Sequence, residues 1–544
     1  MPPTSPQRPE SFDAVVVGAG FAGLYALHRL RGLGLKVRVY EAAGGVGGTW
    51  WWNRYPGCRC DVESLEYSYG FSPELEQEWV WTERYASQPE ILAYLEHVAD
   101  RFDLRRDIRL ETRVESARFD EARGLWRVRT EDGGEAQARW CVMATGCLSS
   151  PNTPDLPGAE RFKGRVLHTG RWPHEGVDFA GRRVAVIGTG SSAIQAIPLI
   201  AEQAARLHVF QRTASYTVPA RNRPLAPEEQ RKVKADYRAF REGARRQLAA
   251  FYMDPRDQSA LEASPEARRQ VFEARWAAGG ARFGASFRDL LTDPEANRTA
   301  ADFIRDKIAG AVRDPRTAAL LQPRQPFACK RVCLDTGYYE TFNRPNVTLV
   351  DAAADPIQGL GETGLRTAAG EYEVDDVVLA TGFDAMTGAL SRIDIRGRGG
   401  RTLNQAWAAG PRAYLGLMSA GFPNLFLITG PGSPSVLTNM VVSIEQHVDF
   451  VAGCIGHLAG RGLDVIEASE AAQDAWIEHV GEVAATTLYP GCNSWYLGAN
   501  VPGKPRVFMP YIGFPAYAAR CEEVAARGYE GFALGRTGAE AQPA

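Results

Sequence analysis

The chain of 544 residues is longer than one hydrophobic core usually supports, so more than one domain is expected. Its hydrophobic content of 45% and charged content of 23% are ordinary for a globular protein. A formal net charge of −3 gives no electrostatic argument for binding nucleic acid or an anionic membrane. No apolar run reaches the roughly 18 residues of a spanning helix, and the proline-rich first ten residues lack the apolar core of a signal peptide.

The cysteine content indicates a cellular compartment. Nine cysteines, an odd number at scattered positions, suit a reducing cytoplasm better than a disulfide framework. Cys58 and Cys60 are interpreted as packing thiols. Cys329 and Cys333 are spaced C-x₃-C on a positively charged stretch, where packing and a redox role both remain open. We therefore expect a cytoplasmic protein, with no metal site and no protein partner.

A glycine-rich turn follows the first buried strand, residues 14–17. Gly18, Gly20 and Gly23 are spaced G-x-G-x-x-G and open a helix, and Glu41 ends the next strand about 20 residues on. Glycines let backbone N–H groups approach a pyrophosphate, and the acid accepts from ribose hydroxyls. In this context the motif predicts a dinucleotide site rather than a chance turn.

Residues 44–61 are too irregular and aromatic for one regular element. Glycines beside three tryptophans, among them Gly48, Thr49 and Trp50, suit a backbone that wraps a flat ring system. An aromatic core loop is the alternative. The nearby Glu41 favours a flavin.

The rest of the first half is expected to pack around this site. The pattern predicts a helix over residues 89–102 and strands over 109–114, 126–128 and 140–143. Residues 144–146, Ala-Thr-Gly, bring the backbone close to a cofactor again.

A second dinucleotide unit opens with a strand over residues 184–187. The turn after it contains Gly188, Gly190, Ser191 and Ser192, with alanine at the third glycine position, an accepted variant. The following strand ends near Arg212, where an NAD site would have an acid. Because a cation can pair with a 2′-phosphate, NADPH is predicted rather than NADH, and a solvated surface arginine is the alternative.

Beyond this unit the composition changes. Residues 226–324 are rich in Ala, Arg, Glu and Gln with helical periodicity, which predicts a helical insertion. By composition Lys330 and Arg331 are surface charges or a helix C-terminal pair. A second Ala-Thr-Gly at residues 380–382 closes the second unit, and residues 424–435 are a strand that enters a glycine-rich turn before a helix over 437–451.

The connection between the two units contains the most distinctive segment, residues 162–173. From the residues alone it is a loop, a short apolar run and a second loop, with His168 a hydrogen-bonded structural histidine and Trp172 a packing residue. It also resembles the fingerprint of the type I Baeyer–Villiger monooxygenases, F-x-G-x-x-x-H-x-x-x-W followed by Pro or Asp. The matching residues are Phe162, Gly164, His168, Trp172 and Pro173.

Further segments extend this resemblance over nearly the whole chain. Residues 47–61 are similar to the flavin-contacting segment of the phenylacetone and steroid monooxygenase subgroup. The resemblance implies that Arg331 is the active-site arginine, that Asp61 pairs with it, and that Lys330 joins Arg212 on the 2′-phosphate. It implies that Trp495 lies in a mobile loop that closes over NADP and substrate. The implied substrate-pocket residues are Val62, Ser435, Val436, Leu437 and Met440.

The expected fold class is α/β, with two Rossmann-like dinucleotide-binding domains, one for FAD and one for NADPH, and a helical insertion. The FAD-binding domain is expected over residues 1–148 and 385–544, the NADPH-binding domain over 149–225 and 325–384, and the insertion over 226–324.

The resemblance implies a reaction. NADPH reduces FAD, O₂ adds at the flavin C4a to give a peroxide, and a ketone is converted to an ester or lactone, with sulfoxidation as a further activity. A guanidinium suits this chemistry because it remains cationic and donates to a developing oxyanion. A flavin monooxygenase acting mainly on sulfides or amines, and an NADPH-dependent disulfide reductase, are the alternatives. The ketone, aryl, cyclic or steroid, is left open.

Overall fold

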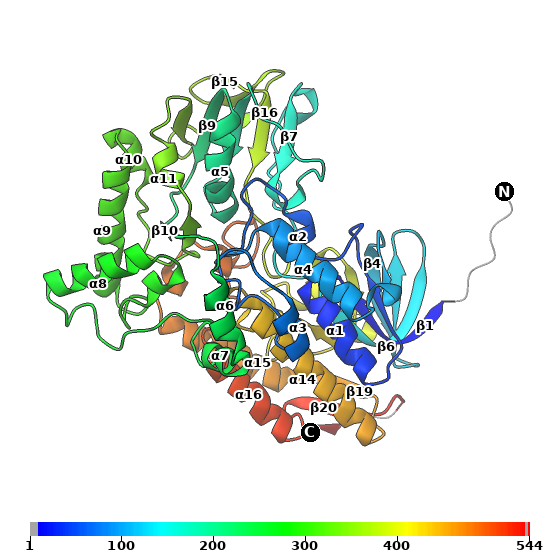
Figure 1. The fold of residues 1–544 in the computed structure, drawn as a ribbon. Coiled ribbons are helices and arrows are strands. Elements are labelled where there is room, and N and C mark those ends of the chain that lie inside the picture. The colour runs from blue at the N-terminus through cyan, green and yellow to red at the C-terminus, as the bar shows by residue number, and fades with distance from the viewer. Residues whose placement is uncertain (1–8, 539–541, 544) are drawn as a thin grey trace.

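A computed structural model describes residues 9–538 and 542–543. The expected proline-rich tail, residues 1–8, lies outside the described residues. The predicted α/β class with two dinucleotide-binding units is confirmed. Two separate sheets carry the two glycine-rich turns (Figure 1). Of the helical insertion, residues 294–321 lie beside the second sheet, whereas residues 227–245 lie lower in the figure and contact residues 65–79.

The first sheet has the strand order β17-β4-β5-β6-β1-β2-β3, and β18 pairs with β6. Its core is parallel, since Val17 of β1 is in register with Tyr40 of β2 and with Met143 of β6. Successive β1 side chains enter different hydrophobic clusters, Val16 in one and Val15 in the other, as the two-residue period of a strand requires. The strands are β1 Glu10–Val17, β2 Val37–Tyr40, β3 Ile108–Arg109, β4 Val114–Asp120, β5 Leu125–Thr130, β6 Glu135–Met143, β17 Asp394–Arg396 and β18 Leu425–Leu427.

Helices from both ends of the chain cover this sheet. The long α14 packs against α1, so residues near position 450 lie beside residues near position 30 (Figure 1). The helices of this part are α1 Phe21–Gly32, α2 Thr49–Trp52, α3 Pro73–Glu78, α4 Gln88–Arg101, α12 Gly388–Ser391, α13 Leu403–Ala406, α14 Met440–Gly460, α15 Glu470–Ala485 and α16 Phe514–Ala526.

The second sheet is wholly parallel, in the order β12-β9-β8-β16-β7. It lies at the top of Figure 1, with α5 packed on it. Its elements are β7 Arg165–His168, β8 Arg183–Ile187, α5 Ser191–Gln203, β9 Arg206–Gln211, α11 Tyr338–Thr341, β12 Val347–Asp351 and β16 Asp376–Leu379. Smaller sheets are formed by β10 Thr217–Pro219 with β11 Cys333–Asp335, by β13 Ile357–Leu360, β14 Gly364–Thr367 and β15 Glu371–Glu373, and by β19 Val465–Ala468, β20 Phe532–Gly535 and β21 Gln542–Pro543.

The insertion is helical, and capping residues followed by proline mark where three of its helices begin. Proline stands at the first helical position of α8, α9 and α10, after a capping residue in each case. Asp293, for example, accepts hydrogen bonds from the backbone N–H groups of Glu295 and Ala296. The insertion helices are α6 Pro227–Lys234, α7 Tyr237–Arg245, α8 Pro265–Ala278, α9 Pro294–Ala311 and α10 Pro315–Leu321.

Three local expectations were wrong. Residues 110–113 are not strand, because β3 ends at Arg109 and β4 begins at Val114. The helix expected from residue 437 starts at Met440, since Asn439 caps it by accepting from the Val441 N–H. Cys329 and Cys492 form a disulfide, although the cysteine pattern favoured free thiols; the fold brings their Cα atoms to 5.7 Å, within the range for bridging. The other seven cysteines, Cys333 included, are free.

Among the described helices, none has both the length and the apolar character needed to cross a bilayer.

Candidate active site

A cavity of about 1500 Å³ lies between the two glycine-rich turns. Its wall includes Gly18 and Gly20 from the first turn and Gly188 and Gly190 from the second. Single-ligand pockets are roughly 300–1,000 Å³. The cavity therefore has room for two ligands, one at each turn.

The first turn is shaped as a close cradle. Gly18 has φ +104°, and a Cβ there would lie 2.5 Å from the Ala144 carbonyl oxygen. A Cβ at Gly23 would lie 1.8 Å from the Gly18 oxygen, so this glycine serves helix-to-turn packing rather than the cavity wall. The turn and the Ala-Thr-Gly segment after β6 thus meet backbone to backbone, which leaves no room for a side chain at Gly18.

Glu41 lies at the end of β2, buried, where it lines the cavity. Its carboxylate accepts from the backbone N–H groups of Ala19 at 2.6 Å and Ala43 at 2.7 Å. Burial raises the pKa of this carboxyl, although both hydrogen bonds act in the opposite direction. The geometry fits an acceptor for a ribose hydroxyl.

The aromatic segment folds over the first turn. Gly48 is the N-cap residue of the short α2, and Gly20 and Gly48 approach so closely that a Cβ on Gly48 would lie 3.0 Å from the Gly20 Cα. Thr49 and Trp50 line the cavity. The Trp50 indole N–H donates to the Tyr67 hydroxyl at 3.3 Å, which fixes the ring beside the space that a flat ligand would fill.

The second turn is more open. Gly188 repeats the first cradle, with φ +110° and a Cβ position 2.4 Å from the Ala380 oxygen, but a Cβ at Gly190 would meet no atom within 4 Å. Ser191 and Ser192, which begin α5, also line the cavity. The open face at Gly190 suits a nucleotide that enters and leaves.

Two cations lie at the edge of this second turn. Arg212 and Lys330 both line the cavity. Burial lowers the pKa of Lys330, and the positive charge of Arg212 lowers it further. Two neighbouring cations that repel each other form a site for a dianion such as a 2′-phosphate.

Asp61 and Arg331 meet in the same cavity. The Arg331 guanidinium donates from Nε to Asp61 Oδ2 at 2.5 Å and from Nη2 to Oδ1 at 2.7 Å, while Nη1 donates to the Val436 carbonyl at 2.6 Å. Burial acts to lower the pKa of Arg331, but the charge and hydrogen bonds of Asp61 outweigh it, so the pKa lies above its ordinary value. The guanidinium is thus a fixed, permanent cation.

The predicted substrate-pocket residues divide into two groups. Val62, Val436 and Met440 line the cavity, whereas Ser435 and Leu437 are not part of its wall. Ser435 is fully buried with φ +44°, and its hydroxyl points to the Met386 sulfur at 3.6 Å. It therefore shapes the turn instead of meeting a ligand.

The distinctive segment 162–173 lies behind the site. His168 is buried; its Nδ1 accepts from the Gly170 N–H at 2.9 Å and its Nε2 lies 3.3 Å from the Thr381 hydroxyl. Burial lowers the pKa of His168, so it is neutral near pH 7. Trp172 is buried against Phe179. The remaining fingerprint residues, Phe162, Gly164 and Pro173, are likewise absent from the cavity wall, to which this segment contributes Gly170 and Arg171.

Residues that the sequence did not single out join the two units. Gln195, on α5, accepts from the Tyr55 hydroxyl at 2.8 Å and donates to the Arg59 carbonyl at 3.1 Å. No sequence motif marks a glutamine inside an apolar helix as an interdomain contact. Its polarity on a buried helix face was the available signal.

Comparison with known proteins identifies the family. A family model described as pyridine nucleotide-disulphide oxidoreductase matches residues 15–238. A Baeyer-Villiger monooxygenase of Pseudooceanicola batsensis is 45% identical over 97% of this chain and 97% of its own. The chain belongs to the Baeyer–Villiger monooxygenases.

Two further relatives are informative. The phenazine N-monooxygenase PhzNO1 of Lysobacter antibioticus is 43% identical to this Baeyer–Villiger monooxygenase over 96% of this chain and 97% of its own. A solved structure, oxidized steroid monooxygenase bound to NADP, is 56% identical with a TM-score of 0.93, covering 97% of this chain and all of the other. The predicted class, a flavin- and NADPH-dependent Baeyer–Villiger monooxygenase, is confirmed at the level of the family.

Proposed function

We propose that this Baeyer–Villiger monooxygenase binds FAD at Gly18, Gly20 and Glu41 and NADPH at Gly188, Gly190 and Arg212, and converts a ketone to an ester or lactone. The observation that carries the proposal is the Arg331–Asp61 pair in a cavity that reaches both glycine-rich turns. The domain division 1–148 with 385–544, 149–225 with 325–384, and 226–324 accompanies this proposal, supported by the two sheets.

When bound, FAD supplies the redox chemistry, taking electrons from NADPH and oxygen from O₂. The contribution of Arg331 is charge: it presents a guanidinium that stays protonated and stabilises the oxyanion that develops when a ketone carbonyl is attacked. Asp61 accepts from Nε and Nη2 on one edge of that guanidinium and the Val436 carbonyl accepts from Nη1, which preorganises the cation. The two side chains are partly exposed toward the cavity, 30% for Arg331 and 25% for Asp61, so bound cofactor and substrate would be what excludes water from the interaction.

Lys330 and Arg212 select the nucleotide in this proposal. Their charges fit the 2′-phosphate that distinguishes NADPH from NADH. Trp495 lies in a 3₁₀ turn, Trp495–Leu497, and lines the cavity. We propose that Trp495 covers the bound nucleotide and so excludes water from the reacting centre.

We further propose a cytoplasmic enzyme that uses O₂ and a small-molecule ketone and needs no protein partner. Sulfoxidation is proposed as a secondary activity. Oxygenation of a ring nitrogen is the second candidate, favoured by the relative named phenazine N-monooxygenase. The Trp172-Pro173 fingerprint and the placement of Arg331 support the ketone reaction instead.

A disulfide reductase would need a thiolate beside the flavin. The cavity wall contains Cys58, Cys60, Cys147 and Cys333. Burial raises the pKa of Cys58 to about 12 and that of Cys333 to about 11, and it raises the pKa of Cys60 and Cys147 as well, so all four are protonated near pH 7. A protonated buried thiol is a poor nucleophile. This chemistry opposes the reductase alternative.

The test is oxygenation of a panel of aryl, cyclic and steroid ketones by the purified yellow enzyme with NADPH and ¹⁸O₂. We expect an ester or lactone with one ¹⁸O atom, identified by mass spectrometry. Phenazine is tested beside the ketones, and its oxygenation at nitrogen with no ketone converted would establish the second candidate. Consumption of NADPH with peroxide as the sole product would contradict both.

A further inference from the structure

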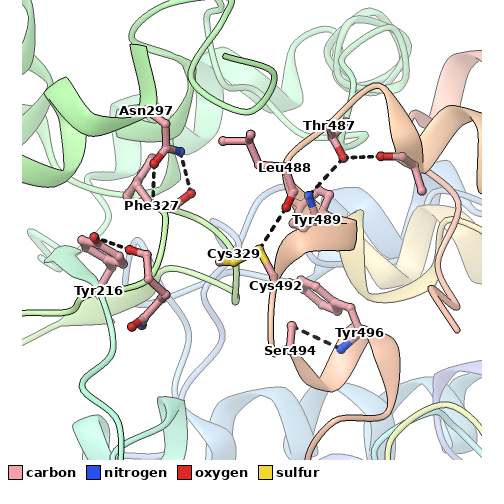
Figure 2. The surroundings of a disulfide bond; sticks show 12 residues. Tyr216, Asn297, Phe327, Cys329, Thr487, Leu488, Tyr489, Cys492, Ser494 and Tyr496 are labelled. Atoms are coloured by element: carbon pink, nitrogen blue, oxygen red, sulfur yellow. Dashed lines mark hydrogen bonds between the residues drawn. A yellow bond between two sulfur atoms is a disulfide. The ribbon is translucent and has the colours of Figure 1, made fainter. Parts of the chain in front are cut away.

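The Cys329–Cys492 disulfide joins two segments that carry proposed site residues. Cys329 directly precedes Lys330 and Arg331, and Cys492 lies three residues before Trp495. Figure 2 shows the bond between the segment that contains Phe327 and the turn that contains Tyr489. The two cysteines are 163 residues apart in sequence. The bond therefore connects the arginine segment to the tryptophan loop.

The Cys329 side is firmly anchored without the disulfide. The Asn297 side chain, on α9, donates to the Phe327 carbonyl at 2.9 Å and accepts from the Phe327 N–H at 2.8 Å. The Phe327 ring is 1% exposed. On the other side of Cys329, Arg331 is held by Asp61. This segment is the fixed end of the connection.

The Cys492 side has little regular structure. Residues 486–513 contain no α-helix or strand, and their regular structure is two 3₁₀ turns, Tyr489–Gly491 and Trp495–Leu497. Hydrogen bonds and burial hold this segment: the Leu488 N–H donates to the Leu291 carbonyl at 2.9 Å, Asn500 donates to the Phe383 carbonyl at 2.6 Å, and Tyr496 is 2% exposed. The disulfide adds a covalent attachment three residues before Trp495.

We propose that this disulfide is a redox-controlled tether of the loop that carries Trp495. Intact, it holds the loop over the nucleotide side of the cavity; reduced, it lets the loop open and the nucleotide leave. The step is thiol–disulfide exchange: the thiolate of a dithiol attacks one sulfur and breaks the S–S bond, its second thiol releases the mixed disulfide, and two protein thiols and one oxidised dithiol result. Disulfides in reducing compartments are usually transient and redox-active.

Burial of the disulfide couples its reduction to opening of the loop. Cys329 is 3% and Cys492 7% exposed, so a dithiol reaches the bond only when the loop opens locally. Loop opening and nucleotide release are linked in this proposal. Bound NADP⁺ must then lower the equilibrium constant for reduction of the disulfide by the same factor by which reduction weakens NADP⁺ binding. The nucleotide part rests on the proposed function, whereas the tethering of the loop does not.

The first measurement counts thiols in the holoenzyme. Alkylation after denaturation without reductant should add seven groups per chain, and nine after full reduction. Alkylation after native incubation with dithiothreitol should also give nine, more slowly with NADP⁺ present. A count of nine without reductant, or seven after native incubation, would overturn redox control.

The second measurement follows the loop and the nucleotide. Native dithiothreitol treatment should weaken NADP⁺ binding about 5–20-fold by equilibrium dialysis and speed chymotryptic cleavage after Trp495 or Tyr496 by a similar factor. The Cys329→Ala/Cys492→Ala double variant should match the reduced protein and no longer respond to dithiothreitol. Cys454→Ala, a buried free cysteine on α14, is the matched control and should behave as wild type.

The outcomes separate the two proposals. Faster cleavage on reduction in a protein that oxidises no ketone would leave the tether standing and overturn the proposed function. If the protein oxidises ketones but reduction changes neither its NADP⁺ affinity nor its rate of chymotryptic cleavage, the tether alone is overturned. Because wild type can be reduced without mutation, the test does not depend on the double variant folding.

Discussion

Two hydrogen bonds join the guanidinium of Arg331 to the carboxylate of Asp61 across 270 residues of chain. Asp61 follows the aromatic segment that folds over the first glycine-rich turn, and Arg331 follows the helical insertion into the second unit. The ion pair therefore forms only when both cofactor-binding units are folded and in contact. The proposed catalytic charge of Arg331 therefore depends on the relative position of the two units as well as on Arg331 itself.

The first prediction concerns this pair. Arg331→Ala should lower ester formation roughly 100–1,000-fold, because a preorganised charge at the developing oxyanion is removed. Arg331→Lys should recover little, since an ammonium cannot make the two parallel bonds to Asp61. The measurement is ester formed per NADPH oxidised. Ester formation by Arg331→Ala at the wild-type rate would remove Arg331 from the mechanism.

The second prediction concerns nucleotide choice. Lys330→Ala and Arg212→Ala should each raise the KM for NADPH roughly 10–100-fold, the equivalent of about 1.5–3 kcal/mol for one charge-assisted hydrogen bond. The KM for NADH, which has no 2′-phosphate, is the internal control and should change little. If the KM values for NADPH and NADH rise equally, these residues have a structural function instead.

The same lysine predicts a pH dependence. Burial and the charge of Arg212 lower the pKa of Lys330, so it loses its proton at a lower pH than an exposed lysine does. The KM for NADPH should therefore rise as the solution becomes alkaline, while binding is strongest at lower pH where the amine is charged. Lys330→Arg, which keeps its charge, should flatten this rise. A parallel rise in both proteins would exclude Lys330 as its source.

Local sequence reasoning located the two glycine-rich turns because their chemistry is local. At Gly18 and Gly188 the positive φ and the close approach to a neighbouring strand exclude every side chain, so the requirement appears in the sequence itself. Family resemblance extended this to Asp61 and to Arg331, which by composition alone was a surface charge or part of a helix C-terminal pair. Neither route identified Gln195.

The disulfide escaped prediction for a physical reason. Pairing of Cys329 with Cys492 depends on how the insertion packs on the loop 163 residues later, and no spacing rule connects them. Long-range pairs of this kind are settled by tertiary contacts. The start of α14 has a local cause instead, since the Asn439 side chain accepts from the Val441 N–H and begins the helix at Met440.

The third prediction tests the contact between the units. Gln195→Leu removes the hydrogen bonds that Gln195 makes with the Tyr55 hydroxyl and the Arg59 backbone, and leaves buried or partly buried polar groups without partners, at about 1–3 kcal/mol each. The melting temperature should fall by several degrees, and the melting curve of flavin release is the measurement. Tyr55→Phe removes one of these bonds and should cause a smaller fall. Equal melting of Gln195→Leu and wild type would show that this contact does not join the units.

The last prediction concerns the attachment of the helical insertion. Glu66 is buried beside it and accepts from the Tyr252 N–H at 2.6 Å. Burial raises its pKa to about 8; the hydrogen bond from Tyr252 and the charges of Arg282 and Arg241 oppose this, and Glu63 adds to it.

The sign of the effect follows from proton binding. Between the ordinary glutamate value and pH 8 the folded state holds a proton on Glu66 that the unfolded state has lost, so the free energy of unfolding decreases as pH rises through this window. Glu66→Gln, which stays neutral and can still accept from Tyr252, should flatten the decline. Melting temperatures of both proteins from pH 5 to pH 8 are the measurement. If the two curves stay parallel over this range, Glu66 does not carry the proton and the insertion is held independently of pH.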